Sequence, residues 1–228
     1  MLKVELHAHA SEDKEDNLSY TAKDLIDKAS SLGYDVLFLT FHNKVIEGKF
    51  FEELSAYAKS KNILLFAGCE ATIEGRHTLI YNITDDERKM INSFDDLRKL
   101  KSDLKKNGRE VLIIASHPYF PFPFKKISLH EKLSANIDLF DAIEWSTFYT
   151  NFFNFNKRAT IIAKKYSKPM TGGGDVHTLD QVGYTYTLID ADKELESIIL
   201  AIKKGNIKVE SKPLPLFIFM KITFKMMK

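Results

Sequence analysis

The 228-residue chain lacks the features that mark secreted, membrane-spanning and strongly charged proteins. Its single cysteine, Cys69, excludes an internal disulfide framework and fits a reducing compartment. No run reaches the roughly 18 apolar residues of a membrane-spanning helix. The first residues lack the apolar core and small-residue cleavage site of a signal peptide. The formal net charge is only +2, so overall charge does not favour nucleic acid. We therefore expect a cytoplasmic protein without a membrane span.

The chain also lacks internal repeats, low-complexity linkers and compositional breaks, so residues 1–228 are expected to form one domain. Strand candidates without strict polar alternation, as in strands buried on both faces, lie at residues 3–6, 36–40, 63–69, 78–82, 111–116, 142–145 and 170–173. Helix candidates lie at residues 21–32, 50–61, 94–107, 154–166 and 193–203. This alternation favours a parallel sheet closed into an α/β barrel, whose active site forms at the C-terminal ends of the strands.

Six of the seven histidines lie at or next to the end of a strand candidate. His7 and His9 follow the first strand, and an i, i+2 spacing in extended backbone puts both imidazoles on one face. Asp175 and His177 repeat this spacing after the last strand, and Glu70 follows the third. The other members of the set are His42, His77 and His117, whereas His130 falls in an expected helical segment.

A cluster of imidazoles and carboxylates at one barrel mouth is typical of a metal site. Both groups bind zinc, manganese and iron, and no thiolate competes with them. The candidate ligands outnumber what one ion needs. We therefore expect two or three divalent ions (Zn, Mn or Fe), with a carboxylate bridging some of them.

Taken in order, these motifs resemble the PHP (polymerase and histidinol phosphatase) family. The matching segments are His7-Ala8-His9, Asp13, Thr40-Phe41-His42-Asn43, Glu70, His77, Ser116-His117-Pro118 and Asp175-Val176-His177. The sequence departs from the family pattern in two places. Phe41 replaces the aspartate of a Thr-Asp-His motif, which looks like a supporting position. The acidic segment 10–16 leaves Asp16 or Glu12 as alternatives to Asp13.

The resemblance implies a distorted (β/α)7 barrel, TIM-like and of the PHP type, that makes residues 1–228 one PHP-like catalytic domain. Family members act on phosphomonoesters, phosphodiesters and DNA 3′ ends. The implied metal ligands are His7, His9, Asp13, His42, Glu70, His77, His117, Asp175 and His177. On this basis we expect hydrolysis by a metal-bound hydroxide, with Glu70 bridging two ions and Asp175 or His177 assisting proton transfer.

Two arginines are candidates for binding substrate. Arg76 lies beside His77, and Arg158 follows the sixth strand candidate. The planar guanidinium suits phosphate, although an ordinary surface position is an equal alternative for Arg76. Glu144, in the sixth strand candidate, could support a ligand or bind substrate.

Aromatic residues are frequent at 118–126 and 145–153, where they could stack a base or form an apolar lid. The apolar, basic extension at about 213–228 is expected to pack on the barrel or on a second subunit, with a membrane surface as the alternative. The oligomeric state stays open, including a homo-oligomer.

The function that these residues favour is hydrolysis of a small-molecule phosphate ester. A 3′-5′ exonuclease or oligonucleotide phosphodiesterase is the first alternative, less favoured because the net charge is near zero. A non-catalytic metal-binding scaffold is the second, suggested by Phe41. The substrate and the native metal are not determined by the sequence.

Overall fold

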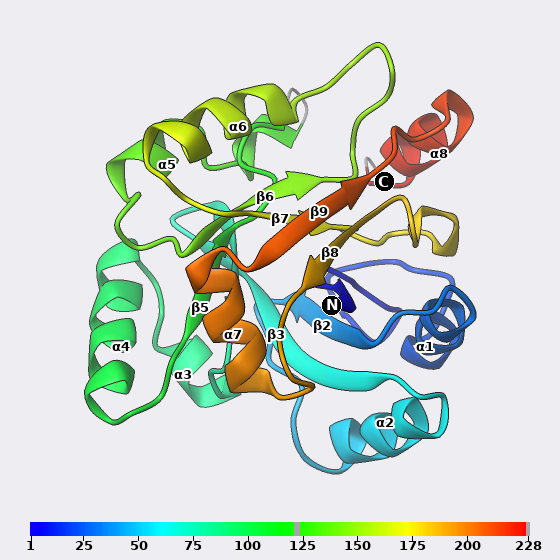
Figure 1. The fold of residues 1–228 in the computed structure, drawn as a ribbon, viewed down its shortest axis with the longest axis horizontal. Coiled ribbons are helices and arrows are strands. Elements are labelled where there is room, and N and C mark those ends of the chain that lie inside the picture. Colours follow the sequence, from blue (N-terminus) through cyan, green and yellow to red (C-terminus); the bar gives the residue numbers. More distant parts are fainter. Residues whose placement is uncertain (121–123, 227–228) are drawn as a thin grey trace.

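Nine strands form one sheet in the computed structural model, which describes residues 1–120 and 124–226. Across these residues the strand order is β7-β6-β5-β4-β3-β2-β1-β8-β9 (Figure 1). The strands are β1 (Leu2–Glu5), β2 (Val36–His42), β3 (Leu64–Ile73), β4 (Arg76–Tyr81), β5 (Leu112–Ala115), β6 (Ala142–Ser146), β7 (Met170–Gly173), β8 (Thr185–Ile189) and β9 (Ile207–Ser211). The first seven overlap the strand candidates, whereas β8 and β9 are not predicted.

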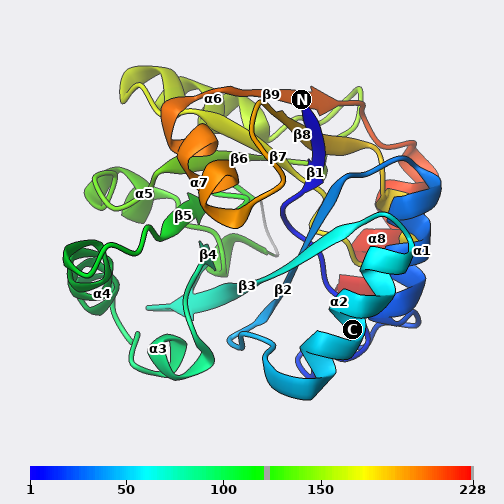
Figure 2. The same ribbon diagram turned by 60° about the horizontal axis from the view of Figure 1, so that its bottom comes forward.

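The sheet curls into a nearly closed barrel (Figure 2). The segments that follow β1 and β7 meet at the seam, where Ala8 and Val176 form an isolated parallel bridge. β7 also contacts β8, because the Thr187 hydroxyl donates to Gly172 O (2.9 Å) and accepts from Gly172 N (2.8 Å). The predicted α/β barrel is therefore confirmed.

The sheet is mixed, which corrects the expectation of a parallel sheet. β1-β2-β3 and β5-β6-β7 are parallel, but β4 runs antiparallel to both of its neighbours. The cause is the two-residue turn Glu74-Gly75, whose φ angles of 48° and 74° are both positive, as tight hairpins favour. β8 and β9 also pair antiparallel. Their partly exposed side chains explain why a search for buried strands does not find them.

Eight α-helices lie in the described part of the chain: α1 (Ala22–Ser31), α2 (Gly48–Ser60), α3 (Asp85–Lys89), α4 (Phe94–Lys106), α5 (Glu131–Ala135), α6 (Asn156–Lys165), α7 (Leu195–Lys204) and α8 (Leu216–Met226). The five predicted helices are found to within two residues at each end. α1 and α4 begin at capping boxes, with Thr21 and Ser93 as the N-caps.

Helix α7 covers one end of the barrel, and the candidate ligands lie at the other end. The buried face of α7, which includes Ile198 and Ile202, packs with the barrel interior residues Val4 and Phe38. This helix follows β8 (Figure 2). Because β8 runs antiparallel to β1, the helix lies at the end of the barrel where β1 begins, opposite the end at which His7 and His9 follow β1. The segments beyond the C-terminal strand ends therefore form the mouth.

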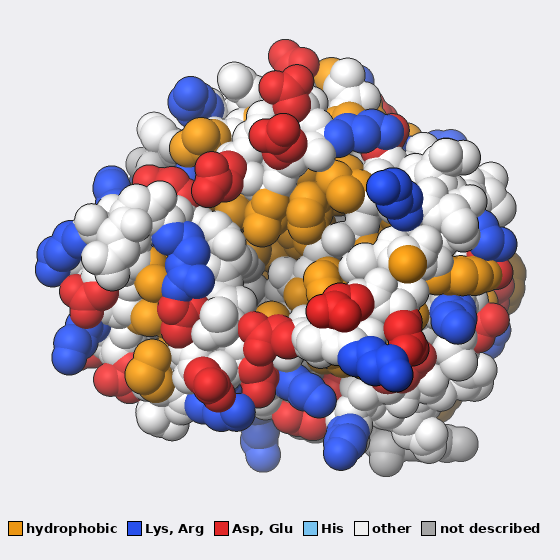
Figure 3. All heavy atoms as spheres, turned by 90° about the horizontal axis from the view of Figure 1, so that it is seen from below, with side chains coloured by type: hydrophobic (Ala, Val, Ile, Leu, Met, Phe, Trp, Pro, Cys, Tyr) orange, Lys and Arg blue, Asp and Glu red, His pale blue; other side chains and the backbone are white. Residues whose placement is uncertain are grey.

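Among the described residues, no helix combines the length and apolar character that a membrane span needs. On the face shown in Figure 3, acidic and basic side chains are interspersed around a hollow with apolar side chains. This face therefore carries no extended patch of one charge sign.

Candidate metal centre

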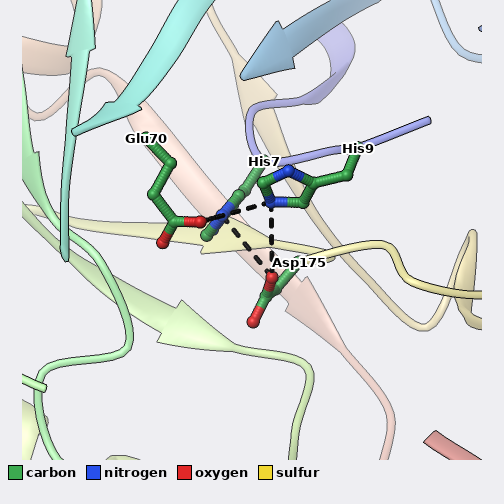
Figure 4. A group of neighbouring side chains, drawn as sticks. All are labelled: His7, His9, Glu70 and Asp175. Atoms are coloured by element: carbon green, nitrogen blue, oxygen red, sulfur yellow. Dashed lines mark ion pairs between the residues drawn. The ribbon is translucent and has the colours of Figure 1, made fainter. Parts of the chain in front are cut away.

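Two pairs of candidate ligands meet at the seam of the barrel. His7 and His9 follow β1, and the bridge between Ala8 and Val176 places them beside the residues that follow β7. Asp175 Oδ1 lies 3.5 Å from His7 Nε2 and 3.7 Å from His9 Nε2 (Figure 4). The i, i+2 spacing thus turns both imidazoles toward one carboxylate.

Glu70 lies at the centre of the site. Because β3 continues to Ile73, Glu70 is inside the strand rather than after it, and it is only 1% exposed. Its Oε2 lies 3.2, 3.3 and 3.1 Å from Nε2 of His7, His9 and His42, and its Oε1 lies 3.0 Å from His77 Nδ1 and 2.8 Å from His117 Nε2. One carboxylate therefore faces five imidazoles, three on one oxygen and two on the other.

His77 and His117 reach Glu70 from strands of opposite direction. β4 begins at the mouth because it is antiparallel to its neighbours, whereas β5 ends there. His117 has a φ of +23°, an unfavourable backbone conformation for a residue with a Cβ. Glu144 Oε2 accepts from His117 N at 2.6 Å and helps to hold this conformation.

The acidic segment after β1 contributes two carboxylates to the site. Asp13 Oδ2 accepts from His42 N at 2.8 Å and lies 3.0 and 3.1 Å from Nδ1 of His42 and His9. Asp16 Oδ2 lies 3.5 and 3.6 Å from Nδ1 of His9 and His42, and 3.6 Å from His177 Nε2. Asp13 and Asp16 are thus both at the site rather than alternatives to each other.

Glu12 and Phe41 have roles outside the cluster. Glu12 accepts from Ala22 N, at 3.0 and 3.2 Å, and so caps the start of α1. Phe41 is buried in the core beneath α1 and α2. It precedes His42 in an extended strand, so the two side chains point to opposite faces. The aspartate expected at position 41 would therefore point away from the cluster in this backbone.

Three groups of these side chains have donor atoms within 4.8 Å of one another: His7, His9, Glu70 and Asp175; His9, Asp13, Asp16 and His42; and His42, Glu70 and His77. Nε2 of His7, Nε2 of His9 and Oδ2 of Asp16 are buried without a hydrogen-bond partner. Buried polar atoms are normally paired, and a divalent cation would pair with these nitrogens and oxygens together. The residues present therefore fit a centre of more than one metal ion.

Carboxylates and imidazoles shift one another's pKa in this site. Burial alone would raise the pKa of Glu70, but the surrounding imidazoles, first His77 and His7, hold it well below its usual value. Burial disfavours charged imidazoles, yet the neighbouring carboxylates raise the pKa of His42 to about 11 and that of His177 to about 9. The cluster therefore holds protons that metal ions would displace.

Two further buried carboxylates lie behind the ligands. Glu144 Oε1 is 2.9 Å from His7 Nδ1 and orients the imidazole, as expected for a supporting residue. Glu5 Oε1 accepts from His7 N at 3.0 Å, and burial raises the pKa of Glu5 to about 8. A Cβ at Gly173 would overlap Glu144 Oε1, and one at Gly174 would lie 2.6 Å from Glu5 Oε2. The two glycines thus leave the space that these carboxylates occupy.

One buried amide, that of Gln181, bonds four backbone groups of the loop that carries Asp175 and His177. Gln181 Nε2 donates to Gly174 O at 3.3 Å and to Asp175 O at 3.1 Å. Its Oε1 accepts from the backbone N–H groups of His177 and Thr178, both at 2.8 Å. Asp175 has a φ of +44°, so Gln181 holds an otherwise unfavourable backbone conformation.

Sequence reasoning does not single out Glu5 or Gln181. A signal for Glu5 was present: it stands two residues before His7, so in an extended strand its side chain lies on the same face as the His7 imidazole. Gln181 stands three residues after Thr178, the spacing of a capping box, but this signal does not indicate contact with the ligand loop.

Both arginine candidates contact the loop after β5. Arg76 Nη1 donates to three carbonyl oxygens between Lys125 and Ser128, at 2.9 to 3.0 Å. Arg158 is exposed, and its guanidinium lies 4.9 Å from the centre of the Tyr119 ring. Their role in substrate binding stays a prediction.

The two aromatic loops form one wall of the mouth. The Phe120 ring stacks on the His117 ring at 4.3 Å, and Phe120 also packs with Phe148 and with Ile218 and Ile222 of α8. The C-terminal extension thus packs on the barrel, as expected. Residues 121–123 of the first loop lie outside the described residues.

Comparison with known proteins identifies relatives of this chain. The family described as PHP-associated matches residues 153–207. The structure of PsfC from Pseudomonas syringae superposes with a TM-score of 0.66 at 17% identity, over 99% of this chain and 98% of that one. The lesion-specific endonuclease EndoQ from Pyrococcus furiosus gives a TM-score of 0.64 at 17% identity, over 91% of this chain but only 57% of its own length. A Bifidobacterium adolescentis protein assigned as a metal-dependent phosphoesterase gives 0.51 at 16%, over 77% and 87% of the two chains. None of the curated proteins matches the sequence significantly.

At these identities the solved structures establish the fold, and the PHP-associated match adds sequence evidence for the segment from just before α6 to the start of β9. The ordered motifs add the ligand pattern across the remainder of the chain. Together, these findings confirm that the chain resembles the PHP family: the family match covers residues 153–207, and the solved structures share the fold.

Proposed function

We propose that the chain is a metal-dependent hydrolase of small phosphate esters, with residues 1–228 forming one catalytic domain. The observation that carries this proposal is the position of Glu70, a buried carboxylate with imidazoles on both oxygens. One ion needs three or four protein ligands. The three groups overlap at His9, His42 and Glu70, so together they would hold two or three ions.

The metal ions would lower the pKa of water and neutralise charge on the phosphate oxygens. The protein would hold them through His7, His9, Asp13, Asp16, His42, Glu70, His77, His117, Asp175 and His177. Glu144 keeps the His7 imidazole in one orientation through its Nδ1. His177 Nδ1 lies 3.4 Å from Asp175 Oδ1 at the mouth, and this pair is suited to pass a proton to the leaving oxygen.

The donor set contains nitrogen and oxygen but no sulfur. Cys69 is buried, burial raises the pKa of its thiol to about 12, and it belongs to none of the three groups. A set of this kind suits manganese, iron or zinc and gives no preference for a thiolate-seeking ion.

A nuclease or oligonucleotide phosphodiesterase is the second candidate. The similarity to a lesion-specific endonuclease supports it, and exposed Phe152 and Phe153 after β6 offer surfaces on which bases could stack. A small substrate is favoured because the formal net charge of +2 gives no general attraction for nucleic acid.

The experiment combines metal analysis with a substrate panel. The protein is loaded with manganese, zinc or iron, its metal content is measured by inductively coupled plasma spectrometry, and p-nitrophenyl phosphate, histidinol phosphate, nucleotides and labelled oligonucleotides are tested. We expect two or three ions per chain and turnover of a phosphomonoester. Glu70→Gln should lower kcat by at least about 100-fold. Glu74→Gln is the matched control, because Glu74 belongs to the same hairpin but pairs with Lys132 at the surface.

Full turnover by the metal-free protein would refute the proposal. Cleavage of oligonucleotides alone, with a steep salt dependence, would favour the nuclease. Binding of the ions without turnover of any ester would favour a metal-binding scaffold.

A further inference from the structure

The exposed apolar side chains of this chain gather on two segments near the barrel mouth. Of the twelve large apolar side chains that are exposed in the described part of the chain, six lie there. They are Phe152 and Phe153 between β6 and α6, and Leu216, Phe217, Met220 and Phe224 on α8. We call these six side chains the apolar rim. Exposed clusters of this kind mark interaction sites more often than isolated apolar residues do.

We propose that the apolar rim docks on an anionic lipid surface. Helix α8 has two apolar faces, and only one of them is covered. Ile218 and Ile222 are buried against the barrel. Phe217, Met220 and Phe224 follow one another at three- and four-residue spacing, so they form a stripe along the helix, and they are 70%, 48% and 62% exposed. With this stripe exposed, α8 can lie flat on a lipid surface and insert its outer, apolar face into it.

The two segments of the rim are fastened together. Leu214 N donates to Tyr149 O at 2.9 Å just before α8 begins. The Phe219 ring stacks on the Phe148 ring at 4.3 Å. The loop after β6 and α8 accordingly lie on the same side of the molecule (Figure 1). Both segments can therefore contact one surface without rearrangement.

The charge around the rim is complementary to anionic headgroups. Residues 212–228 contain four lysines and no aspartate or glutamate, and residues 145–158, up to the first turn of α6, contain Lys157 and Arg158 and no acidic residue. Lys221 pairs with Asp180 at 2.8 Å, but both side chains are more than half exposed, so the ammonium remains accessible. Basic residues beside an inserted apolar stripe add electrostatic attraction to anionic lipid.

The same features disfavour two other occupants. A second copy joined through α8 would place lysine-rich segments against each other, because a two-fold interface repeats the same patch on both sides. Nucleic acid would engage the lysines and the phenylalanines but would leave Leu216 and Met220 exposed, since bases stack on aromatic rings. A lipid surface covers all six side chains.

The test is co-sedimentation of the full chain with vesicles of phosphatidylcholine and phosphatidylglycerol (3:1) and with vesicles of phosphatidylcholine alone. We expect the wild type to pellet with the anionic vesicles and much less with the neutral ones. The double variant Phe217→Ser, Phe224→Ser should bind the anionic vesicles at least about tenfold more weakly. Met90→Ser is the matched control, because Met90 is 60% exposed after α3 and lies outside the rim.

Circular dichroism and turnover of the metal-loaded protein verify that the double variant is folded, and these readouts are independent of lipid. Equal binding to both vesicle types, or anionic binding that the double variant retains, would overturn the proposal. A wild-type dimer in light scattering that the double variant loses would identify a second copy as the occupant. Oligonucleotide binding that depends on Phe217 and Phe224 would identify nucleic acid.

Discussion

Loading the metal-free protein with manganese at pH 7 should release at least about three protons per chain. The reason is the mutual stabilisation of charged imidazoles and carboxylates around Glu70. Burial opposes charged imidazoles, but the neighbouring carboxylates raise the pKa of His42 to about 11, that of His177 to about 9, and that of His7 well above its usual value. All three are protonated at pH 7, and a metal ion binds imidazole only in its neutral form.

The carboxylates add nothing to this count. Neighbouring histidines keep the pKa of Asp13 and Glu70 low despite burial, and they lower that of Asp175 to about 2. These groups are therefore ionised before the ions bind. His77 adds nothing either, because burial lowers its pKa below 6.5 despite Glu70 beside it. Linkage then requires the overall loading constant to rise by roughly three orders of magnitude per pH unit near neutrality.

Isothermal titration calorimetry in buffers of different ionisation enthalpy measures the proton count directly. His177→Asn should release about one proton fewer than the wild type. His77→Asn, the matched control, should release about the same number, because it removes a ligand candidate that is neutral at pH 7. Release of less than one proton by a wild-type chain that binds its ions would refute the reasoning. An equal loss of protons in both variants would also contradict it.

Two further predictions concern residues behind the ligands, Gln181 and Glu144, and a third concerns the ligand candidate His177. Gln181→Ala should alter the visible absorption of the cobalt-loaded protein and lower kcat by about tenfold. The control is Asn156→Ala, which removes another buried amide, one whose side chain bonds the backbone N and O of Ser146. This control should lower the melting temperature and leave the spectrum unchanged. Glu144→Gln should weaken metal affinity by about 10- to 100-fold, measured by competition with a chelator. The raised pKa of His177 stabilises the metal-free protein below pH 6.5, so its own contribution of about 3 kcal/mol to the unfolding free energy should be lost as the pH rises from 6.5 to 9, measured as the difference in urea unfolding between the wild type and His177→Asn.

The sequence predicts the ligand-bearing strand ends well because their signal is local. An i, i+2 pair after a buried strand needs only extended backbone for both side chains to share a face, and His7 with His9 behaves in this way. His42 and Glu70 stand late in the neighbouring parallel strands β2 and β3, where they are register partners. Parallel strands that end at one barrel mouth bring such residues together whatever the details of the connections.

The remaining features depend on contacts between segments far apart in the chain. The direction of β4 follows from the conformation of Glu74-Gly75, and the loop after β1 decides that Asp16 joins the site while Glu12 caps α1. No periodic pattern in the sequence indicates either the direction of β4 or the positions of Asp16 and Glu12. β8 and β9 are paired on the β1 side of the sheet and are only partly buried, so they resemble exposed segments.

The position of two candidate ligands depends on residues that hold their backbone. His117 and Asp175 both have positive φ angles, 23° and 44°, which cost free energy of about 1–3 kcal/mol each in residues with a Cβ. Each is held from another element: Glu144 of β6 bonds His117 N, and Gln181 bonds Asp175 O. Neither support belongs to the three candidate ligand groups, yet each bonds the backbone of a residue whose side chain lies in the cluster. The convergence of ligands is therefore a property of the supported backbone as much as of the histidines themselves.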